Sequence, residues 1–224
     1  PTAPAQDHDA ASYQELADMG FDSVRFYLNY AMFESDSKPY TYREEGFRWL
    51  DTNIAWAKAA GIRLVLNMHY PQGGYQSQGN GTALWTDPEN QRRLVKLWGE
   101  IARRYADEPA IQGYGLINEP VVPELSNVNE TVGQCQRLMQ RCTDEIRRYD
   151  RNHIVFVEHV AAVKDMSTGE NLWNKYPIDD LWFLIDDDNA VYETHFYTPA
   201  VFTHQSAGDS VEYPKPCYVD NYLE

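Results

Sequence analysis

The chain has 224 residues, of which 43% are hydrophobic and 24% are charged, a composition typical of a soluble globular protein that can bury a sizeable core. Its 19 basic and 34 acidic residues give a net charge of −15, which argues against a nucleic-acid-binding protein because a phosphate backbone needs a basic surface. No apolar run approaches the roughly 20 residues of a membrane-spanning helix, and no signal-peptide pattern is visible near the N-terminus.

Helices and strands are predicted to alternate along the chain. Apolar residues at helical spacing between cap and stop residues indicate the helices, and short runs rich in β-branched and aromatic residues indicate the strands. In chain order we predict a short helix over 10–20, a strand over 21–28, a helix over about 44–60, a strand over 63–69, a helix opening at Asp87-Pro88, a strand over 111–118, a helix over about 130–149, and strands over 153–160 and 190–197.

This alternation implies βαβ units and a parallel sheet. Two architectures fit it, a (β/α)8 barrel and an open doubly wound sheet. No nucleotide-binding glycine motif follows any predicted strand, and the glycine-rich stretch 71–81 lacks the lysine of a phosphate loop. A nucleotide-binding enzyme is therefore disfavoured.

Polar side chains collect near the carboxyl ends of four predicted strands. A single histidine or arginine near a strand end is more often a structural group, but together these residues favour a barrel, because a barrel brings all strand ends to one mouth. The residues are Arg25 in the first strand, His69 at the end of the second, Asn118 and Glu119 at the end of the third, and His195 and Tyr197 in the last.

The segments "VRFYL", "LNMHY", "GYGLINEP" and "ETHFYTPAVFTHQ" resemble successive motifs of glycoside hydrolase family 5, the cellulase-like enzymes with a (β/α)8 TIM barrel. The resemblance implies that residues 1–224 are a single, partial catalytic domain. It also implies a retaining enzyme that hydrolyses β-1,4-glycosidic bonds in β-glucan. A β-mannanase or other β-glycosidase of the family, or a catalytically incomplete glycan-binding fragment, is the alternative.

The same resemblance implies a polysaccharide or oligosaccharide as substrate and a secreted, extracellular protein. It implies no cofactor and no metal ion, since two carboxylates suffice for the reaction. Neither a nucleic acid nor a membrane is expected as a partner.

Roles for individual residues also follow from the resemblance. Glu119 would be the general acid and base that protonates the leaving oxygen and later activates water. The other residues would bind substrate or support catalysis: Asn118 at the sugar 2-hydroxyl, Arg25 beside the nucleophile, His69 at the cleavage point, and His195 and Tyr197 near substrate and nucleophile.

Aromatic residues in the loops could stack on sugar rings. Tyr70, Tyr75 and Trp85 are the candidates, although Trp85 could equally pack beneath its own loop. The acidic run 185–189 lacks the spacing of a calcium loop and is interpreted as a solvated loop.

Among the cysteines, Cys135 and Cys142 are expected to be small core residues about two helical turns apart, too far for a disulfide with each other. At most one of them could pair with Cys217.

The chain departs from the family pattern because the nucleophilic glutamate is expected on the seventh barrel strand, and only strands two to six are apparent. Three explanations remain open. The chain could be a partial barrel completed by another segment or by self-association, an enzyme that recruits Glu158 or Glu193 as its second carboxylate, or an inactive glycan binder.

Overall fold

The computed structural model describes residues 8–195 and 197. The chain divides into two units, Pro1–Glu193 and Thr194–Glu224, and the first contains every helix and strand that is described. Of the second unit, only Thr194, His195 and Tyr197 are among the described residues. The expectation of a single domain over 1–224 stays a prediction.

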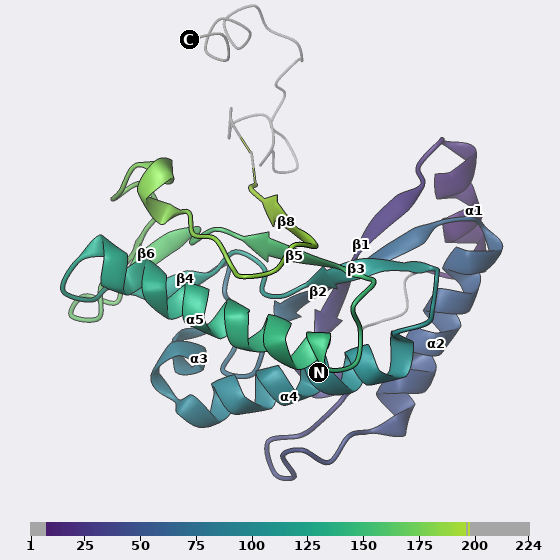
Figure 1. Cartoon of the computed structure of the whole chain (residues 1–224), viewed down its shortest axis with the longest axis horizontal. Helices are drawn as coiled ribbons and strands as arrows, with labels where there is room; N and C mark the ends of the chain where they lie inside the picture. The colour runs from purple at the N-terminus through teal and green to yellow at the C-terminus, as the bar shows by residue number, and fades with distance from the viewer. Residues whose placement is uncertain (1–7, 196, 198–224) are drawn as a thin grey trace, which may run out of the picture. The chain divides into compact units, whose positions relative to one another are not determined.

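The first unit is built on a five-stranded parallel sheet with the order β1-β2-β3-β5-β8 (Figure 1). Its strands are β1 (Ser23–Asn29), β2 (Arg63–Tyr70), β3 (Ile111–Gly115), β5 (Ile154–Glu158) and β8 (Ala190–Glu193). The helices are α1 (Ala10–Asp18), α2 (Glu44–Ala59), α3 (Thr82–Thr86), α4 (Pro88–Tyr105) and α5 (Val128–Arg147), with 3-10 turns η1 (Tyr30–Met32) and η2 (Ile178–Leu181). A small second sheet contains β4 (Val121–Pro123), β6 (Ala162–Lys164) and β7 (Asn171–Leu172).

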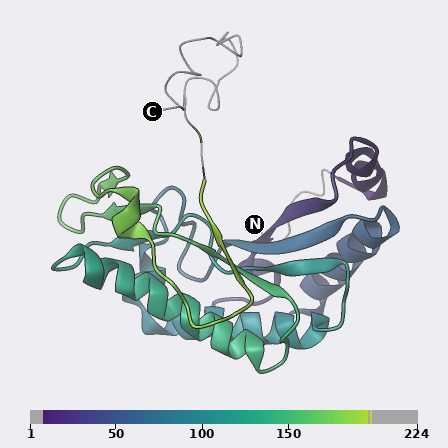
Figure 2. The same ribbon diagram turned by 45° about the horizontal axis from the view of Figure 1, so that its top comes forward.

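The strand order distinguishes between the two predicted architectures. The five strands lie side by side in chain order, without the reversal that gives a doubly wound sheet its switch point. Figures 1 and 2 show α4 and α5 together on one face of the sheet. A sheet wound in one direction with its helices on one face is an incomplete (β/α) barrel.

Local sequence signals explain where the helices begin. The Asp87 side chain accepts a hydrogen bond from the Glu89 amide (2.9 Å), and Pro88 occupies the first turn of α4. Asn127 caps α5 in the same way, through the Glu130 amide (2.9 Å). The predicted helices are confirmed, with ends shifted by a few residues.

Three strands, β3, β5 and β8, are clearly shorter than predicted. Strand β3 ends at Gly115 and β8 ends at Glu193, so that neither Glu119 nor His195 belongs to a strand. After β3 the backbone leaves the regular ladder, and the Asn118 amide donates to the carbonyl of Met68 in β2 (3.0 Å). The small second sheet, which the sequence pattern did not indicate, begins directly after this turn.

The hydrophobic core lies between the sheet and its helices. Alternate strand residues, including Phe26, Leu66 and Tyr114, face the helices and are buried. Trp98 of α4 is fully buried, and its indole nitrogen donates to the Leu116 carbonyl (3.2 Å). Within the described residues, no helix is both long and apolar enough to cross a membrane.

The thiols of Cys135 and Cys142 are buried in this core and unpaired. Burial raises the pKa of both thiols, which stay protonated and pack as small apolar groups, as predicted. Cys217 lies outside the described residues.

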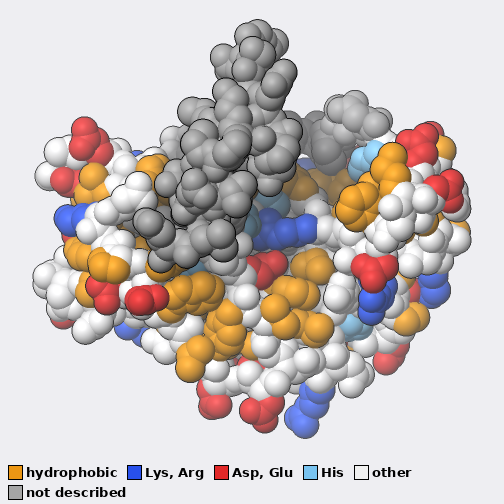
Figure 3. Space-filling model, turned by 90° about the horizontal axis from the view of Figure 1, so that it is seen from above, with side chains coloured by type: hydrophobic (Ala, Val, Ile, Leu, Met, Phe, Trp, Pro, Cys, Tyr) orange, Lys and Arg blue, Asp and Glu red, His pale blue; other side chains and the backbone are white. Residues whose placement is uncertain are grey.

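The opposite face of the sheet carries the inward-pointing residues of the incomplete barrel. They alternate with the core residues along each strand and are mostly half-buried, and hydrophobic side chains are visible among charged ones when the molecule is viewed from above (Figure 3). Val191, for example, is 41% exposed. A closed barrel would bury such residues in its interior.

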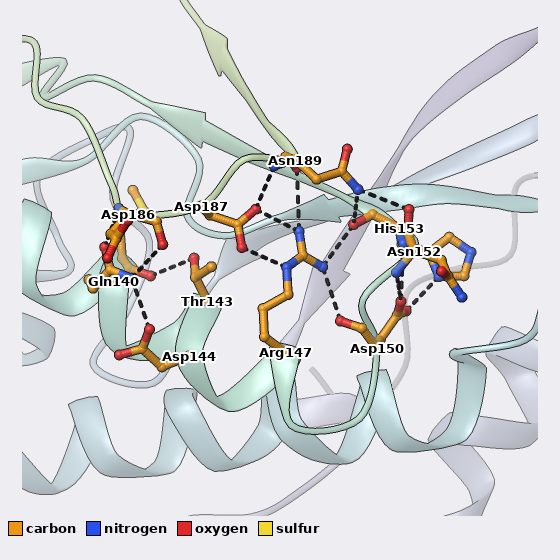
Figure 4. Close-up of polar contacts among 11 residues, drawn as sticks. Gln140, Thr143, Asp144, Arg147, Asp150, Asn152, His153, Asp186, Asp187 and Asn189 are labelled. Atoms are coloured by element: carbon orange, nitrogen blue, oxygen red, sulfur yellow. Dashed lines mark hydrogen bonds and ion pairs between the residues drawn. The ribbon is translucent and has the colours of Figure 1, made fainter.

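The acidic run before β8 is anchored by Arg147 of α5 (Figure 4). The Arg147 guanidinium donates to both carboxylate oxygens of Asp187 (2.7 and 2.9 Å) and to the carbonyls of Asp150 and His153. The interpretation of residues 185–189 as a solvated loop is corrected in part, because the Asp187 side chain is only 9% exposed and Ile185 is buried, whereas Asp186 and Asp188 are exposed.

The Arg147–Asp187 pair leads to a prediction about stability. Asp187→Asn should lower the free energy of unfolding by about 1–3 kcal/mol at pH 7, because it weakens two charge-assisted hydrogen bonds. The exposed neighbour Asp188 provides the matched control, because Asp188→Asn should change the free energy of unfolding by less than about 0.5 kcal/mol. Urea unfolding curves measure both variants, and equal stability at pH 7 would contradict the prediction.

The pH dependence of this difference has a definite sign. The hydrogen bond from Arg147 lowers the pKa of the Asp187 carboxyl in the folded protein below its ordinary value. The contribution of Asp187 is therefore fully present above the unfolded-state pKa and is lost as the pH falls through the folded-state pKa. The difference in unfolding free energy between wild type and Asp187→Asn should therefore shrink as the pH is lowered from the unfolded-state pKa of Asp187 through its folded-state pKa.

Candidate active site

Arg25 lies at the centre of a polar cluster on the inner face of the sheet. Its Nη1 donates to Asn118 Oδ1 (2.5 Å), and its Nη2 donates to Glu158 Oε2 (3.1 Å) and lies 3.6 Å from Glu193 Oε2. Glu158 ends β5, Glu193 ends β8 and Asn118 follows β3. One guanidinium therefore connects β1 to three other strand ends.

Two acidic side chains lie around the Arg25 guanidinium. Of these, the Glu158 side chain is only 2% exposed. Burying a carboxylate is costly unless it is paired, and the Arg25 guanidinium gives the buried Glu158 side chain one charge-assisted hydrogen bond. The Nε of Arg25 is buried without a hydrogen-bond partner, which leaves one donor of the guanidinium unused.

Glu119 lies in a backbone conformation that side-chain-bearing residues rarely adopt. Its φ is +43°, and only one other non-glycine residue in the described part of the chain has a positive φ. The flanking backbone is held on both sides, by the Asn118–Met68 hydrogen bond and by Pro120, whose carbonyl accepts from the Ala161 amide (2.9 Å). Such strain persists only where the surroundings enforce it, and it is concentrated at functional sites.

The second glycine of "GYG", Gly115, leaves room for a buried side-chain amide beside the cluster. A Cβ on Gly115 would lie 2.3 Å from Asn67 Oδ1, so that only glycine fits there. The Asn67 amide in turn lies 2.7 Å from His69 Nδ1. With the amide donating, the neutral imidazole carries its proton on Nε2 and can donate from there.

Tyrosine rings extend from His69 along the mouth. The Tyr27 ring lies 4.4 Å from His69 and 5.9 Å from Tyr70, which stacks on Tyr75 at 4.5 Å with nearly parallel planes. Tyr27 is 40% exposed. Tyr27, Tyr70 and Tyr75 thus form an aromatic wall. The expectation that Tyr70 and Tyr75 stack on sugar rings stays a prediction.

Trp85 does not belong to this wall, and the expectation that it stacks on a sugar is corrected. It is 7% exposed, and its indole donates to the side chain of Gln76 (2.8 Å), which is itself fully buried. The large apolar ring gains more from burial beneath the loop than from solvent exposure.

His195 and Tyr197 belong to the second unit. The Tyr197 hydroxyl lies 3.4 Å from His195 Nδ1. Their expected place near substrate and nucleophile stays a prediction.

The structure brings the side chains of Arg25 and Asn118 into contact, with Glu119 next to Asn118 in the turn after β3 and His69 near the end of β2. The roles expected for these residues stay predictions. Sequence reasoning missed Asn67, although it lies two residues before His69 and the strand period would have placed both on one face. In the part of the chain that the structure describes, no group of three His, Cys, Asp or Glu side chains could hold a metal ion.

These features define a (β/α)-barrel protein with a carboxylate cluster at the carboxyl ends of its strands, which is where active sites of this fold lie. The sequence profile of "Cellulase (glycosyl hydrolase family 5)" matches residues 3–223. The chain therefore belongs to glycosyl hydrolase family 5.

Individual relatives agree with this assignment. Endoglucanase C of Acetivibrio thermocellus is 35% identical over 197 residues, covering 87% of this chain and 51% of that protein. Cellodextrinase A of Ruminococcus flavefaciens is 27% identical over 197 residues, covering 87% of this chain and 52% of that protein. The chain spans about half the length of these relatives.

A solved structure shows the same fold. Endo-glycoceramidase II from Rhodococcus sp., in a complex with a cellobiose-like isofagomine, has a TM-score of 0.69 and 21% identity, over 92% of this chain and 56% of that one. The Pseudomonas stutzeri endoglucanase Cel5A, in complex with cellobiose, has a TM-score of 0.61 and 23% identity, over 82% of this chain and 50% of that one.

The strained turn at Glu119 yields a prediction that does not depend on activity. Glu119→Gly should be more stable than Glu119→Ala by about 1 kcal/mol, because a Cβ penalises a left-handed φ. In an ordinary extended or helical position alanine is the more stable of the two. Chemical denaturation of both variants tests this, and a more stable alanine variant would show that the turn is not strained.

Proposed function

We propose that this chain carries the acid/base half of a retaining β-glycanase that cleaves β-1,4-glucan, with Glu119 as general acid and base. The observation that carries the proposal is the turn from Asn118 to Pro120, which holds Glu119 in a strained conformation beside the Arg25 cluster. Family membership and the similarity to endoglucanases support it.

Asn118 is suited to position a sugar hydroxyl. Its Oδ1 accepts from Arg25 (2.5 Å) and its Nδ2 donates to Ser77 Oγ (2.8 Å), which fix the orientation of the amide. A side-chain amide has two N–H donors, so one remains to bind substrate. Beside it, Glu119 is partly exposed and can reach a glycosidic oxygen.

The second carboxylate of the reaction is proposed to come from a segment that completes the barrel. A retaining mechanism needs two carboxyl groups about 5–5.5 Å apart. Glu158 is unsuited to attack a sugar because it is buried and paired with Arg25. Glu193, whose side chain is 21% exposed, is the alternative within this chain.

We further propose that the enzyme is secreted, because a polymeric glucan cannot enter a cell and its hydrolysis takes place outside. Mannan and xylan are alternative substrates, since substrate choice depends on loops that the fold does not determine.

Glu119→Gln is expected to reduce hydrolysis by about 100- to 10,000-fold, because the amide cannot donate a proton to the leaving oxygen. Released reducing ends should be measured on β-1,4-glucan, mannan and xylan, with this chain and with the longest natural polypeptide that contains it. Glu130→Gln, on the exposed surface of α5, is the matched control and should retain full activity.

An aryl glycoside with an acidic phenol refines this test. Its leaving group needs no proton, so Glu119→Gln should form the glycosyl-enzyme at a nearly normal rate and accumulate it. Undiminished turnover of glucan by Glu119→Gln would refute the assignment.

The open sheet also predicts self-association of this chain when no completing segment is supplied. In the described residues, β1 pairs only with β2 and β8 only with β5, which leaves two sheet edges and a half-buried inner face. Sedimentation velocity should show oligomers that increase with concentration, and Val191→Lys should reduce them by placing a charge on that face. A monodisperse monomer with cooperative unfolding would count against the need for a completing segment or a second copy.

A further inference from the structure

The loop over residues 71–81, which connects β2 to α3, is held in a defined conformation from within. The side chain of Gln76 is fully buried, and its amide nitrogen donates to the carbonyls of Gly74 (3.2 Å) and Gly81 (2.9 Å). Its amide oxygen accepts from the indole of Trp85 (2.8 Å). Because these bonds join separate parts of the loop, a contact that fixes one part of it also restrains the rest.

Two residues of the small second sheet hold this loop from outside. Lys164 of β6 and Asn171 of β7 lie opposite each other in the antiparallel ladder. The Lys164 ammonium donates to the carbonyl of Gly79 (2.9 Å) and to Asn171 Oδ1 (3.2 Å). Asn171 Nδ2 in turn donates to the carbonyl of Gln78 (2.9 Å). Both acceptors of Lys164 are neutral oxygens, and hydrogen bonds from a charged donor to such groups are stronger than neutral ones.

The second sheet and the loop fit closely at Gly79. A Cβ at this position would lie 2.0 Å from Asn171 Oδ1, and the φ of Gly79 is +66°. Any other residue would therefore displace the Asn171 side chain and strain the backbone. The contact between the second sheet and the loop requires glycine at this point.

The same sheet also holds the turn that carries Glu119. Strand β4 follows this turn and pairs in parallel with β6, where Pro123 lies opposite Lys164. The Pro120 carbonyl accepts from the Ala161 amide (2.9 Å), directly before β6. Strand β6 is therefore joined both to the turn, through β4, and to the loop, through the Lys164 side chain.

Loop and turn meet at one side-chain hydrogen bond. Asn118 Nδ2 donates to Ser77 Oγ (2.8 Å), and Ser77 directly precedes Gln78, whose carbonyl is held by Asn171. Asn118 is buried and Ser77 is half-buried. Hydrogen bonds weaken steeply when distance and angle change, so this bond depends on where the loop lies.

We propose that Lys164 and Asn171 are positioning residues that hold Ser77 against Asn118 and thereby fix the orientation of the Asn118 amide. The proposal rests on the proposed function for the role of Asn118 at the sugar 2-hydroxyl. Hydrogen bonds to this hydroxyl strengthen in the transition state of glycoside hydrolysis. A misplaced amide therefore lowers kcat more than it lowers substrate affinity.

The first test observes the amide directly and needs no activity. In the longest natural polypeptide that contains this chain, made with isotope-labelled asparagine, the Asn118 Nδ2 protons are identified by NMR as the signals that disappear in Asn118→Asp. Their exchange with solvent should be at least about tenfold faster in Ser77→Ala and in Lys164→Met, because the amide loses its acceptor or the acceptor moves. Unchanged exchange in folded Lys164→Met would overturn the proposal.

The matched control is Lys58→Met, which removes another lysine and its contact. Lys58 is in the last turn of α2, before β2 begins, and its ammonium lies 2.9 Å from Glu108 Oε1, before β3 begins. This ion pair is at the amino ends of the strands, away from the candidate active site. Exchange of the Asn118 amide and activity should both equal those of the parent.

The second test measures kinetics with and without the 2-hydroxyl. The substrates are an aryl cellobioside and its counterpart that lacks the 2-hydroxyl on the sugar next to the phenol. Lys164→Met should lower kcat about tenfold on the first substrate, with KM changed less than about twofold, and should turn over the second at nearly the parent rate. Equal losses on both substrates would indicate a general disturbance of the loop and would refute the positioning role.

Two further variants complete the test. Asn171→Ala covers the case in which Lys164→Met does not fold, because it removes the donor to Gln78 and should give the same hydroxyl-specific loss. In the double variant, Lys164→Met should add nothing to the effect of Ser77→Ala, since Lys164 acts through Ser77. Losses that add in full would contradict the proposed route.

The result is separable from the proposed function. If Glu119→Gln kept full turnover of glucan while Lys164→Met still lost activity on the hydroxylated substrate only, the acid assignment would fail and the positioning role would stand. If Glu119→Gln abolished turnover and Lys164→Met matched the parent in both tests, the positioning role would fall and the acid would stand.

Discussion

The interaction on which the site depends is the set of contacts made by Arg25. A guanidinium is planar and has five donors, so it can serve several acceptors at fixed angles. Here it connects β1 to Asn118, Glu158 and Glu193, which come from three separate stretches of the chain. The carboxyl ends of the strands are thereby held in one geometry although the sheet is open at both edges among the described residues.

The turn at Glu119 shows how the fold supports this geometry. A left-handed φ at a residue with a side chain costs free energy. Here it is enforced by the hydrogen bond that the Asn118 amide donates to β2 and by the one that Pro120 accepts from the segment after β5. The same bonds define where the side chain starts, so the candidate acid is positioned by backbone that cannot relax without breaking them. Gly115 acts in the same region by leaving space for Asn67, which orients His69.

The charged residues of the sheet gather on one of its two faces, where some apolar residues accompany them. Residues such as Phe26, Leu66 and Tyr114 pack under the helices and supply the apolar burial, whereas Arg25, Asn67, Glu158 and Glu193 point to the other side. This separation lets one face stabilise the fold while the other carries charge. It also leaves the inner face half-buried, which is why a completing segment or a second copy is expected there.

The sequence by itself determined the order of strands and helices, the (β/α) class and the family. It also pointed to Arg25, His69, Asn118 and Glu119 as candidates for the active site. The spacing of apolar residues, the helix caps and the motifs that carry this information are local properties of the chain. The sequence placed Glu119 at the tip of a strand and residues 185–189 in solvent, and it left open whether Trp85 lies at the mouth or beneath its own loop. Tertiary structure placed Glu119 in a turn after the strand, buried Ile185 and Asp187, and packed Trp85 beneath the loop. A strained turn requires hydrogen bonds from distant strands, the burial of a tryptophan depends on what covers it, and the ion pair of Asp187 needs Arg147 from forty residues earlier. The pairing of Arg25 with Glu158 and Glu193 also arises only in three dimensions, because the contacting residues are more than a hundred positions apart in the chain.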